Sequence, residues 1–465
     1  MPILFNWAQL AEITRGQWRG APLPSDMAGV ERITDDSRQV RPGDLFVAIA
    51  GHLRDGHSFV ESACQAGATA ACVSKRRREA KGSNIPLLCV DNTLNAFHEL
   101  ARAHRRRFPG LDVVGITGSS GKTSVRCMLS AIVEHAWPEQ TLSTLGNTNN
   151  HFGVPRNLLR LQPRHRVAVL EIGSNQPGEI AQLTRLIRPR IGLITNIGAA
   201  HLENFGGTLG VVMEKGCLLT GLQGHSVAVI PEQTEHIEIL RQIIGDRPFL
   251  TFGASPQADV QAVYHGCDRN LCRLTLKWRQ SGAVRDLNWH IGGSHQALNA
   301  AAAAAAATAL EIEPDTIVEG LTKTIFPGLR MEILKSSGIN WVNDAYNANP
   351  DSMRSGLEWF FELTAGIDSE SCFLVLGDML ELGEDAPERH RELLDWVKSL
   401  YPADHILPTG PLMQEAARQC GLDGFADVEE CLAALRRMAN PGAWVFLKGS
   451  RSVGLERVVF QPEFP

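Results

Sequence analysis

The chain lacks features that membrane, secreted and general nucleic-acid-binding proteins need. Its 465 residues contain no stretch that approaches the about 18 consecutive apolar residues of a membrane-spanning helix. The N-terminal segment 1–7 has neither a basic region nor a small-residue cleavage site, so we expect no signal peptide. The net charge of −6 leaves no excess of basic residues for general nucleic-acid binding. We therefore expect a cytoplasmic protein with no membrane span and no nucleic-acid partner.

The sequence also has few signs of structural metal sites or of oligomerisation. Its ten cysteines form no C-x-x-C, and no Cys/His cluster has the spacing of a zinc site. We expect these cysteines to be reduced and to pack as small apolar residues. No heptad pattern or obvious apolar interface face appears, so the prediction is a monomer.

A glycine-rich segment between a predicted strand and a predicted helix is the strongest motif. The apolar run Val113–Ile116 precedes it and the helical pattern 125–132 follows it. The segment itself reads Thr117, Gly118, Ser119, Ser120, Gly121, Lys122, Thr123 and Ser124. Glycines let backbone N–H groups approach phosphates, the lysine adds a mobile charge, and the threonine hydroxyl suits Mg²⁺. Although Ile116 replaces the first glycine of the common pattern, this context predicts a nucleoside triphosphate site.

Composition and periodicity divide the chain into three α/β blocks, which we predict to be domains at residues 1–90, 91–325 and 326–465. Apolar strands follow the phosphate loop at 167–172, 191–197 and 227–230 and suit a parallel sheet covered on both faces. Alternation over 261–289 predicts an antiparallel edge, and the alanine run 300–307 predicts a helix packed closely against the sheet.

Polar residues at the predicted strand ends form a second set of candidates. Glu171 ends one apolar strand of the central block, and His201 and Lys215 follow the next. In open α/β sheets, ligands bind beyond the carboxyl ends of the strands. Taken singly, each residue has an ordinary structural interpretation: a buried partner of an arginine, a loop histidine or a surface lysine. Their shared position after strands of the nucleotide-binding sheet favours a functional role.

Several motifs resemble one family along the whole chain. They are the loop 117–124, Asp36-Ser37-Arg38, Gly43–Ala48, Gly146–Pro155, Thr195–Glu203, Asp344–Met353, Leu376–Gly383 and Lys448–Arg451. This set, in this order, is similar to that of the Mur ligases, the ATP-dependent amide-forming enzymes of peptidoglycan synthesis.

The resemblance implies a fold and a reaction. The fold is a small α/β UDP-binding N-domain, a central P-loop ATPase-like parallel sheet and a C-terminal Rossmann-like domain. The reaction is ATP-dependent ligation of D-alanyl-D-alanine to UDP-N-acetylmuramoyl-tripeptide through an acyl phosphate, with release of ADP and phosphate. The third residue of the acceptor peptide, lysine or diaminopimelate, stays open.

The resemblance also implies roles for single residues. Those expected in catalysis are Lys122, Lys215, His201 and Arg330, with Thr123, Glu171, His201 and a carbamylated Lys215 as ligands of two Mg²⁺ ions. Besides the loop, ATP is expected to contact Asn299, Arg330, Asp344 and Asn347. Residues expected to bind the UDP-muramoyl-peptide are Ser37, Arg38, Asn149, Asn150 and Ser174.

Three alternatives fit the sequence less well. The sister ligase that adds the third amino acid carries Asp-Asn-Pro-Arg in its last domain, and that run is absent here. Folylpolyglutamate synthetase would lack the Asp36-Ser37-Arg38 segment. A P-loop switch that cycles on hydrolysis would leave the first and third blocks unexplained.

Overall fold

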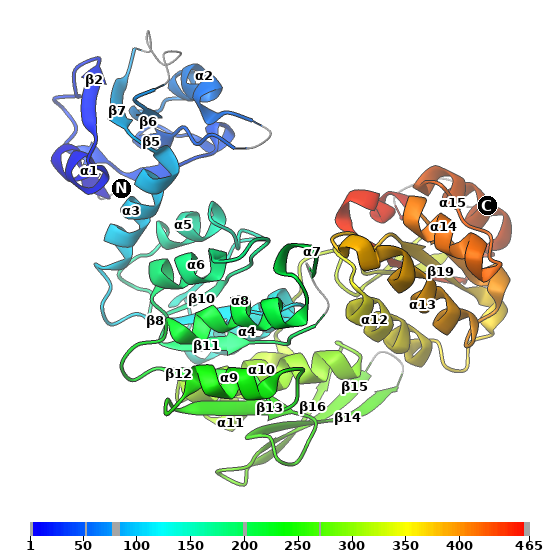
Figure 1. The fold of residues 1–465 in the computed structure, drawn as a ribbon. Coiled ribbons are helices and arrows are strands. Elements are labelled where there is room, and N and C mark those ends of the chain that lie inside the picture. Colours follow the sequence, from blue (N-terminus) through cyan, green and yellow to red (C-terminus); the bar gives the residue numbers. More distant parts are fainter. Residues whose placement is uncertain (1–2, 52–53, 77–83, 199–201, 269–270, 460–465) are drawn as a thin grey trace. The chain divides into compact units, whose positions relative to one another are not determined.

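The computed structural model describes residues 3–51, 54–76, 84–198, 202–268 and 271–459. It divides into two compact units. The first contains Met1–Val113, Glu139–Ile172 and Gln182–Arg188, and the second contains Val114–Pro138, Gly173–Ala181 and Pro189–Pro465. Both units combine helices with largely parallel sheets (Figure 1), which confirms the predicted α/β class. No helix among the described residues is long and apolar enough to cross a membrane.

A five-stranded sheet forms the N-terminal part of the first unit. Its order is β2 (Gln17–Gly20), β7 (Pro86–Val90), β6 (Ala70–Ser74), β5 (Asp44–Val47) and β4 (Arg32–Thr34). Only the β2–β7 pair is antiparallel. Phe46, Val73 and Leu87 pack with α2 (Val60–Gln65) in one apolar core. The short helix η1 (Ser37–Gln39) follows β4, so the Asp36-Ser37-Arg38 motif lies beyond the carboxyl end of that strand.

The rest of the first unit supports the segment that holds Asn149 and Asn150. The parallel strands β9 (Thr141–Ser143) and β10 (Val167–Glu171) flank it in sequence, and α5 (Gly153–Leu158) ends it. The helix α3 (Thr93–Arg105) packs against α1 (Trp7–Thr14) and α5. The side chain of His98 on α3 contacts the carbonyl of His151 at 2.7 Å.

The second unit carries the phosphate loop on a largely parallel sheet. From its far edge the order is β16 (Val284–Trp289), β15 (Leu271–Trp278), β14 (Val260–Asp268), β13 (Phe249–Gly253), β12 (Val227–Pro231), β11 (Ile191–Ile194) and β8 (Asp112–Thr117). The strands from β8 to β14 are parallel. At the edge, β15 is antiparallel to both β14 and β16, as the alternating pattern predicted.

The alanine-rich segment is the helix α10 (Ser294–Ala309), which lies along β13 and β14 and against α4 (Lys122–Ala136). Every residue from Ala300 to Ala307 has zero solvent exposure. Small side chains let the helix approach its neighbours closely, because no atom beyond Cβ separates the backbones. The prediction of a closely packed helix is confirmed.

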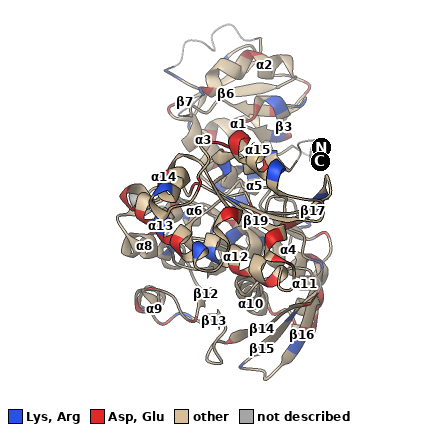
Figure 2. Ribbon diagram, turned by 90° about the vertical axis from the view of Figure 1, so that its right-hand side faces the viewer, with Lys and Arg blue, Asp and Glu red and all other residues tan. Residues whose placement is uncertain are grey.

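The C-terminal part of the second unit is a doubly wound sheet. Its order is β17 (Glu332–Ser336), β18 (Ile339–Asn343), β21 (Trp444–Lys448), β19 (Cys372–Gly377) and β20 (Ile406–Thr409), with only β17 antiparallel. Alternate residues of β19 point to opposite faces: Leu374 packs with α12 (Pro350–Leu363), α13 (Ala386–Lys398) and α14 (Pro411–Cys420), and Phe373 packs with α15 (Val428–Met438). Both acidic and basic residues lie on α13, where Arg391 pairs with Glu388; Figure 2 colours the charged residues of the chain.

One sequence prediction is wrong. Eight cysteines are free, but Cys267 and Cys272 form a disulfide. The antiparallel register of β14 and β15 places these two residues directly opposite each other. Spacing alone did not reveal this, because the pairing depends on where the hairpin turns.

Candidate active site

The phosphate loop depends on two glycines that have no room for a side chain. Gly118 has φ +150° and Gly121 has φ +77°, where a side chain would strain the backbone. A Cβ at Gly118 would lie 2.0 Å from the Thr195 hydroxyl, and one at Gly121 would lie 2.5 Å from the Asn299 amide oxygen. The loop ends at Lys122, the first residue of α4, so the partial positive charge of a 15-residue helix is directed at it.

The end of the neighbouring strand β11 braces the loop. Ser120 donates its backbone N–H to the Asn196 amide oxygen at 2.7 Å, and the Asn196 amide donates to the Ser120 hydroxyl at 2.8 Å. Ser119 N–H bonds the Asn196 carbonyl at 3.1 Å, and Thr195 donates to the Ser120 carbonyl at 2.5 Å. Sequence reasoning missed this role of Thr195 and Asn196. The available signal was that both directly follow the strand next to β8.

Lys122 folds over the loop that it follows. Its ammonium donates to the carbonyls of Gly118 at 2.7 Å and Ser119 at 3.3 Å. Thr123 and Ser124 are buried behind it on the first turn of α4. The predicted loop residues thus form one compact structure, with a cation and a helix N-terminus on the side where an anion would bind.

Lys215 lies deep in the second unit on α8 (Thr208–Thr220) and is only 2% exposed. Its ammonium donates to the Ser174 hydroxyl at 2.9 Å and lies 5.5 Å from the centre of the Phe205 ring. Burial, reinforced by the charge of Lys122, lowers the pKa of Lys215 to about 7 despite the opposing effects of Glu214 and Glu179. Near neutral pH a large fraction of this amine is therefore uncharged and nucleophilic.

The neighbouring glutamate has a separate structural role. Glu214 accepts the backbone N–H groups of Gly178 at 2.6 Å and Ile180 at 2.8 Å, next to the start of α6 (Glu179–Ile187). Its carboxylate therefore holds the segment that carries Ser174 rather than pairing with Lys215 through a hydrogen bond.

Asn299 connects the loop to the C-terminal part of the chain. It lies beside Gly121 and donates to the Gln296 side-chain oxygen at 3.0 Å. Gln296 in turn contacts the Met331 sulfur at 3.2 Å. His295 contacts the same sulfur at 3.2 Å, and burial lowers its pKa to about 4, so the ring is neutral at pH 7.

Three further predicted ATP contacts lie near one another, just before β17 and just after β18. The guanidinium of Arg330 lies 3.9 Å from the centre of the Tyr346 ring, and its buried Nε has no hydrogen-bond partner among the described residues. Asp344 accepts the Lys448 ammonium at 2.5 Å and the Met331 N–H at 3.2 Å. Lys448 also donates to the carbonyl of Asn347 at 3.3 Å. The parallel strands β18 and β21 explain this meeting, since both end here.

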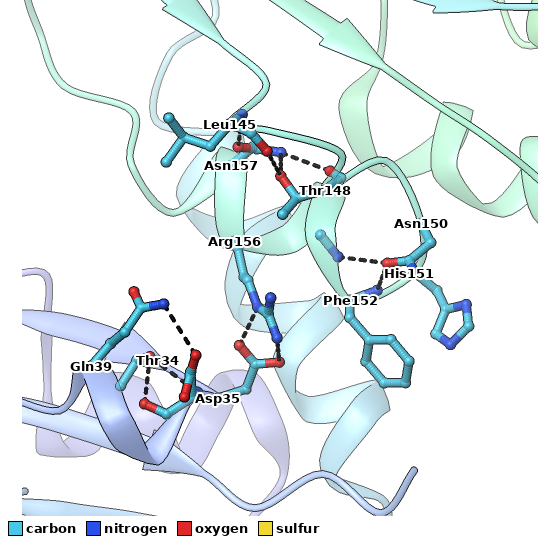
Figure 3. Close-up of polar contacts among 12 residues, drawn as sticks. Thr34, Asp35, Gln39, Leu145, Thr148, Asn150, His151, Phe152, Arg156 and Asn157 are labelled. Carbon is cyan, nitrogen blue, oxygen red and sulfur yellow. Dashed lines mark hydrogen bonds and ion pairs between the residues drawn. The ribbon is translucent and has the colours of Figure 1, made fainter. Parts of the chain in front are cut away.

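The predicted residues Ser37, Arg38, Asn149, Asn150 and Glu171 belong to the first unit. Glu171, 1% exposed at the end of β10, accepts the Asn149 side-chain amide at 2.8 Å. Asn150 accepts the N–H groups of Phe152 and Gly153 and so shapes its own turn (Figure 3). Arg38, next to Ser37, makes a two-pronged contact with Asp36 at 2.9 and 2.8 Å, which lowers the pKa of Asp36 to about 2. His201 lies outside the described residues.

Comparisons with known proteins agree with this layout. The Mur ligase catalytic domain matches residues 30–105, the Mur ligase middle domain 116–307 and the Mur glutamate ligase domain 329–451. The UDP-N-acetylmuramoyl-tripeptide–D-alanyl-D-alanine ligase of Escherichia coli is 34% identical over 97% of both chains. A crystal structure of MurF from Acinetobacter baumannii superposes with a TM-score of 0.88 at 31% identity, covering 98% of this chain and 97% of the other.

A MurF ligase from Thermotoga maritima, solved in complex with ADP, has a TM-score of 0.78 at 26% identity and covers 92% of this chain and 96% of the other. These matches agree with the three-domain fold that the sequence motifs implied. Because the family domains follow one another in the expected order and a relative above 30% identity spans nearly all of both sequences, the chain belongs to the Mur ligase family.

Proposed function

We propose that this protein joins D-alanyl-D-alanine to UDP-N-acetylmuramoyl-tripeptide, using ATP and releasing ADP and phosphate, in the synthesis of peptidoglycan precursors. The observation that carries the proposal is the likeness to the E. coli ligase of that name along 97% of both chains. The braced phosphate loop supports the use of ATP. The reaction takes place in the cytoplasm and the enzyme acts as a monomer.

The chemistry begins with a carboxylate that is too poor an electrophile to react with an amine. Its oxygen attacks the γ-phosphorus of ATP, and the bond from that phosphorus to ADP breaks. The dipeptide amine then attacks the acyl carbon of the acyl phosphate, and phosphate leaves. Lys122 and the N-terminus of α4 stabilise the charge that moves onto the phosphate oxygens during the first step. Such electrostatic stabilisation is the main source of catalysis in phosphoryl transfer.

Magnesium ions would be held mainly by oxygen donors of this chain. Thr123 and Glu171 would be ligands of one ion, and the carbamate of Lys215 and a ring nitrogen of His201 would be ligands of a second. The hydroxyl and carboxylate donors suit a hard cation, and the Asn149 amide at 2.8 Å orients the Glu171 carboxylate. When bound, the ions neutralise phosphate charge.

Carbamylation of Lys215 suits the environment of its amine. The neutral nitrogen attacks CO₂, an N–C bond forms, one C=O bond becomes an anionic oxygen, and a proton leaves to solvent. A pKa of about 7 makes the neutral amine available at physiological pH. The carbamate provides an anionic oxygen ligand in place of a cation that would repel metal ions. Ser174, 2.9 Å from the amine, positions this group and contacts the muramoyl-peptide.

Residues of the C-terminal domain complete the ATP-binding site. Asn299 reads the adenine, Asp344 and Asn347 contact the ribose side, and Arg330 reaches the γ-phosphate when residues 326–465 close onto the central domain of residues 91–325. Two observations support a role for Arg330: the Tyr346 ring holds its guanidinium, and its buried Nε has no partner among the described residues. Closure also keeps water from the acyl phosphate.

The UDP-muramoyl-peptide and the dipeptide bind to different domains. The uridine nucleotide contacts Ser37 and Arg38 of the domain at residues 1–90, and the muramoyl-peptide contacts Asn149 and Asn150. The dipeptide binds on the C-terminal domain. A cavity of about 220 Å³ there is lined by Asp378, Gly410, Asp427 and Arg457, among others, and its opposite charges suit a small zwitterion.

The release of ADP, measured with a panel of substrates, tests the proposal. A UDP-muramoyl-dipeptide and UDP-muramoyl-tripeptides that end in lysine or in diaminopimelate are each combined with D-alanyl-D-alanine, D-alanine, lysine or diaminopimelate. We expect ADP release and a new peptide bond only with D-alanyl-D-alanine. Ligation of a single amino acid to a UDP-muramoyl-dipeptide would instead assign the chain to the sister reaction.

A further inference from the structure

An ion pair connects the two substrate motifs of the first unit. Arg156 donates through Nε to Asp35 Oδ1 at 2.5 Å and through Nη2 to Oδ2 at 2.7 Å (Figure 3). The residues are 121 positions apart in sequence. Asp35 follows β4 and Arg156 lies on α5. The Asp35 side chain is only 4% exposed, so the pair is anchored in a buried carboxylate.

Each residue directly adjoins a motif that we assign to the UDP-substrate, yet belongs to neither. Asp35 precedes Asp36-Ser37-Arg38, and Arg156 follows the segment that ends at Pro155. The charges of Asp36 and Arg38 also act on the guanidinium, and the net result, dominated by Asp35, is a raised pKa of Arg156. The pair is therefore electrostatically connected to the residues proposed to hold the uridine nucleotide.

On the other side, hydrogen bonds extend from α5 to the proposed metal ligand. Asn157, next to Arg156, donates to the Thr148 carbonyl at 2.9 Å and accepts the Leu145 N–H at 3.2 Å (Figure 3). These contacts fix both ends of a short loop. Asn149, which follows Thr148 in the sequence, donates its side-chain amide to Glu171 at 2.8 Å.

We propose that Asp35 and Arg156 are positioning residues that set the distance and orientation between the uridine-binding motif and the muramoyl-peptide loop. The inference rests on the proposed function, because it assumes a substrate long enough to contact both. A two-pronged arginine–carboxylate contact fixes direction as well as distance, which a single hydrogen bond does not. A substrate held at both ends gains affinity only if the two sites keep the correct separation.

Calorimetric titration tests this without requiring ligation. UDP alone and UDP-N-acetylmuramoyl-tripeptide are titrated into the wild type, Arg156→Met, Asp35→Asn and the double variant. We expect the Kd of the complete substrate to rise on the order of tenfold in each single variant, within the range of coupling between contacting residues. The double variant is expected to be no weaker than the weaker single variant. The Kd of UDP is expected to stay within about twofold, because UDP contacts only one of the two motifs.

Arg285→Met is the matched control, because Arg285 forms a two-pronged ion pair with Asp315 far from both motifs in sequence. It is expected to leave both Kd values unchanged. Should Arg156→Met fail to fold, Asp35→Asn keeps the shape of the site and still decides the question. An unchanged Kd for the complete substrate, or an equal loss for UDP and the complete substrate, would overturn the positioning role. Normal binding without ligation by the wild type would count against the proposed function instead.

Discussion

The side chain of Asn196 forms a closed pair of hydrogen bonds with Ser120, accepting its N–H at 2.7 Å and donating to its hydroxyl at 2.8 Å. The bend of the phosphate loop is thus fixed from the adjacent strand end. A loop whose N–H groups are already oriented loses less entropy when phosphate binds.

Asn196→Ala is therefore expected to raise the KM for ATP about tenfold, which corresponds to the loss of one to two hydrogen bonds of ordinary strength. The KM for the UDP-tripeptide is expected to change little. Steady-state kinetics with each substrate varied in turn measures both values. An equal rise in both would mean that the substitution disturbs the fold, not the loop.

Lys122→Ala is expected to abolish ligation while the protein stays folded. Loss of a charge that stabilises a phosphoryl transition state commonly costs ~10²–10³ in rate. Activity is measured as ADP release, and circular dichroism monitors the fold. Lys277→Ala on the exposed side of β15 is the control and is expected to be fully active. Near-normal turnover of Lys122→Ala would contradict the phosphate-loop assignment.

Lys215→Ala is expected to be nearly inactive and partly rescued by short-chain carboxylates, which place an anionic oxygen where the carbamate would be. Lys122→Ala is not expected to be rescued, because its lost group is a cation. A carboxylate rescue of both variants, or of neither, would argue against a carbamate at position 215.

The pH dependence of carbamylation gives a separate prediction. The amine has a pKa of about 7 and reacts with CO₂ only when neutral. After CO₂ is stripped and then restored to the same concentration of dissolved CO₂ at each pH, wild-type activity is therefore expected to recover faster at pH 8 than at pH 6, where most Lys215 side chains are protonated. Recovery rates that do not change between these pH values would show that the Lys215 amine does not limit the step.

Domain closure is expected to make the protein more compact. Small-angle scattering compares the protein alone with its complex with a non-hydrolysable ATP analogue and the UDP-tripeptide. A smaller radius of gyration is expected, because the proposed contacts of Arg330 and Asp344 with ATP require residues 326–465 to close onto the central domain. An unchanged radius would refute the closure mechanism.

Sequence patterns predicted the strand–loop–helix of the phosphate site, the antiparallel edge at β14–β16 and the alanine-rich α10. In each case the order and spacing of apolar, polar and small residues within the segment are typical of the structure that it forms. The strand β13 and the helix α15 were not recognised; β13 is a short apolar segment, of a kind that fits strand and helix alike.

Long-range contacts were not accessible from the sequence. The bonds of Asn196 to Ser120 and the Asp35–Arg156 pair join residues 76 and 121 positions apart and depend on which elements are neighbours in the fold. The Cys267–Cys272 disulfide joins residues five positions apart, but it depends on the register of β14 and β15. No periodicity within one segment reports that information. The motifs identified the segments of the candidate site, and the tertiary fold determined how each one is held.

The complete burial of Ala300–Ala307 has a consequence for inhibitor resistance. Enlarging a side chain in a packed interior commonly costs about 1–3 kcal/mol of stability. Substitutions within this run can therefore do little to shift the helix that presents Asn299 beside Gly121. A compound that binds against Asn299 would face a surface from which resistant variants arise less readily than from an exposed loop.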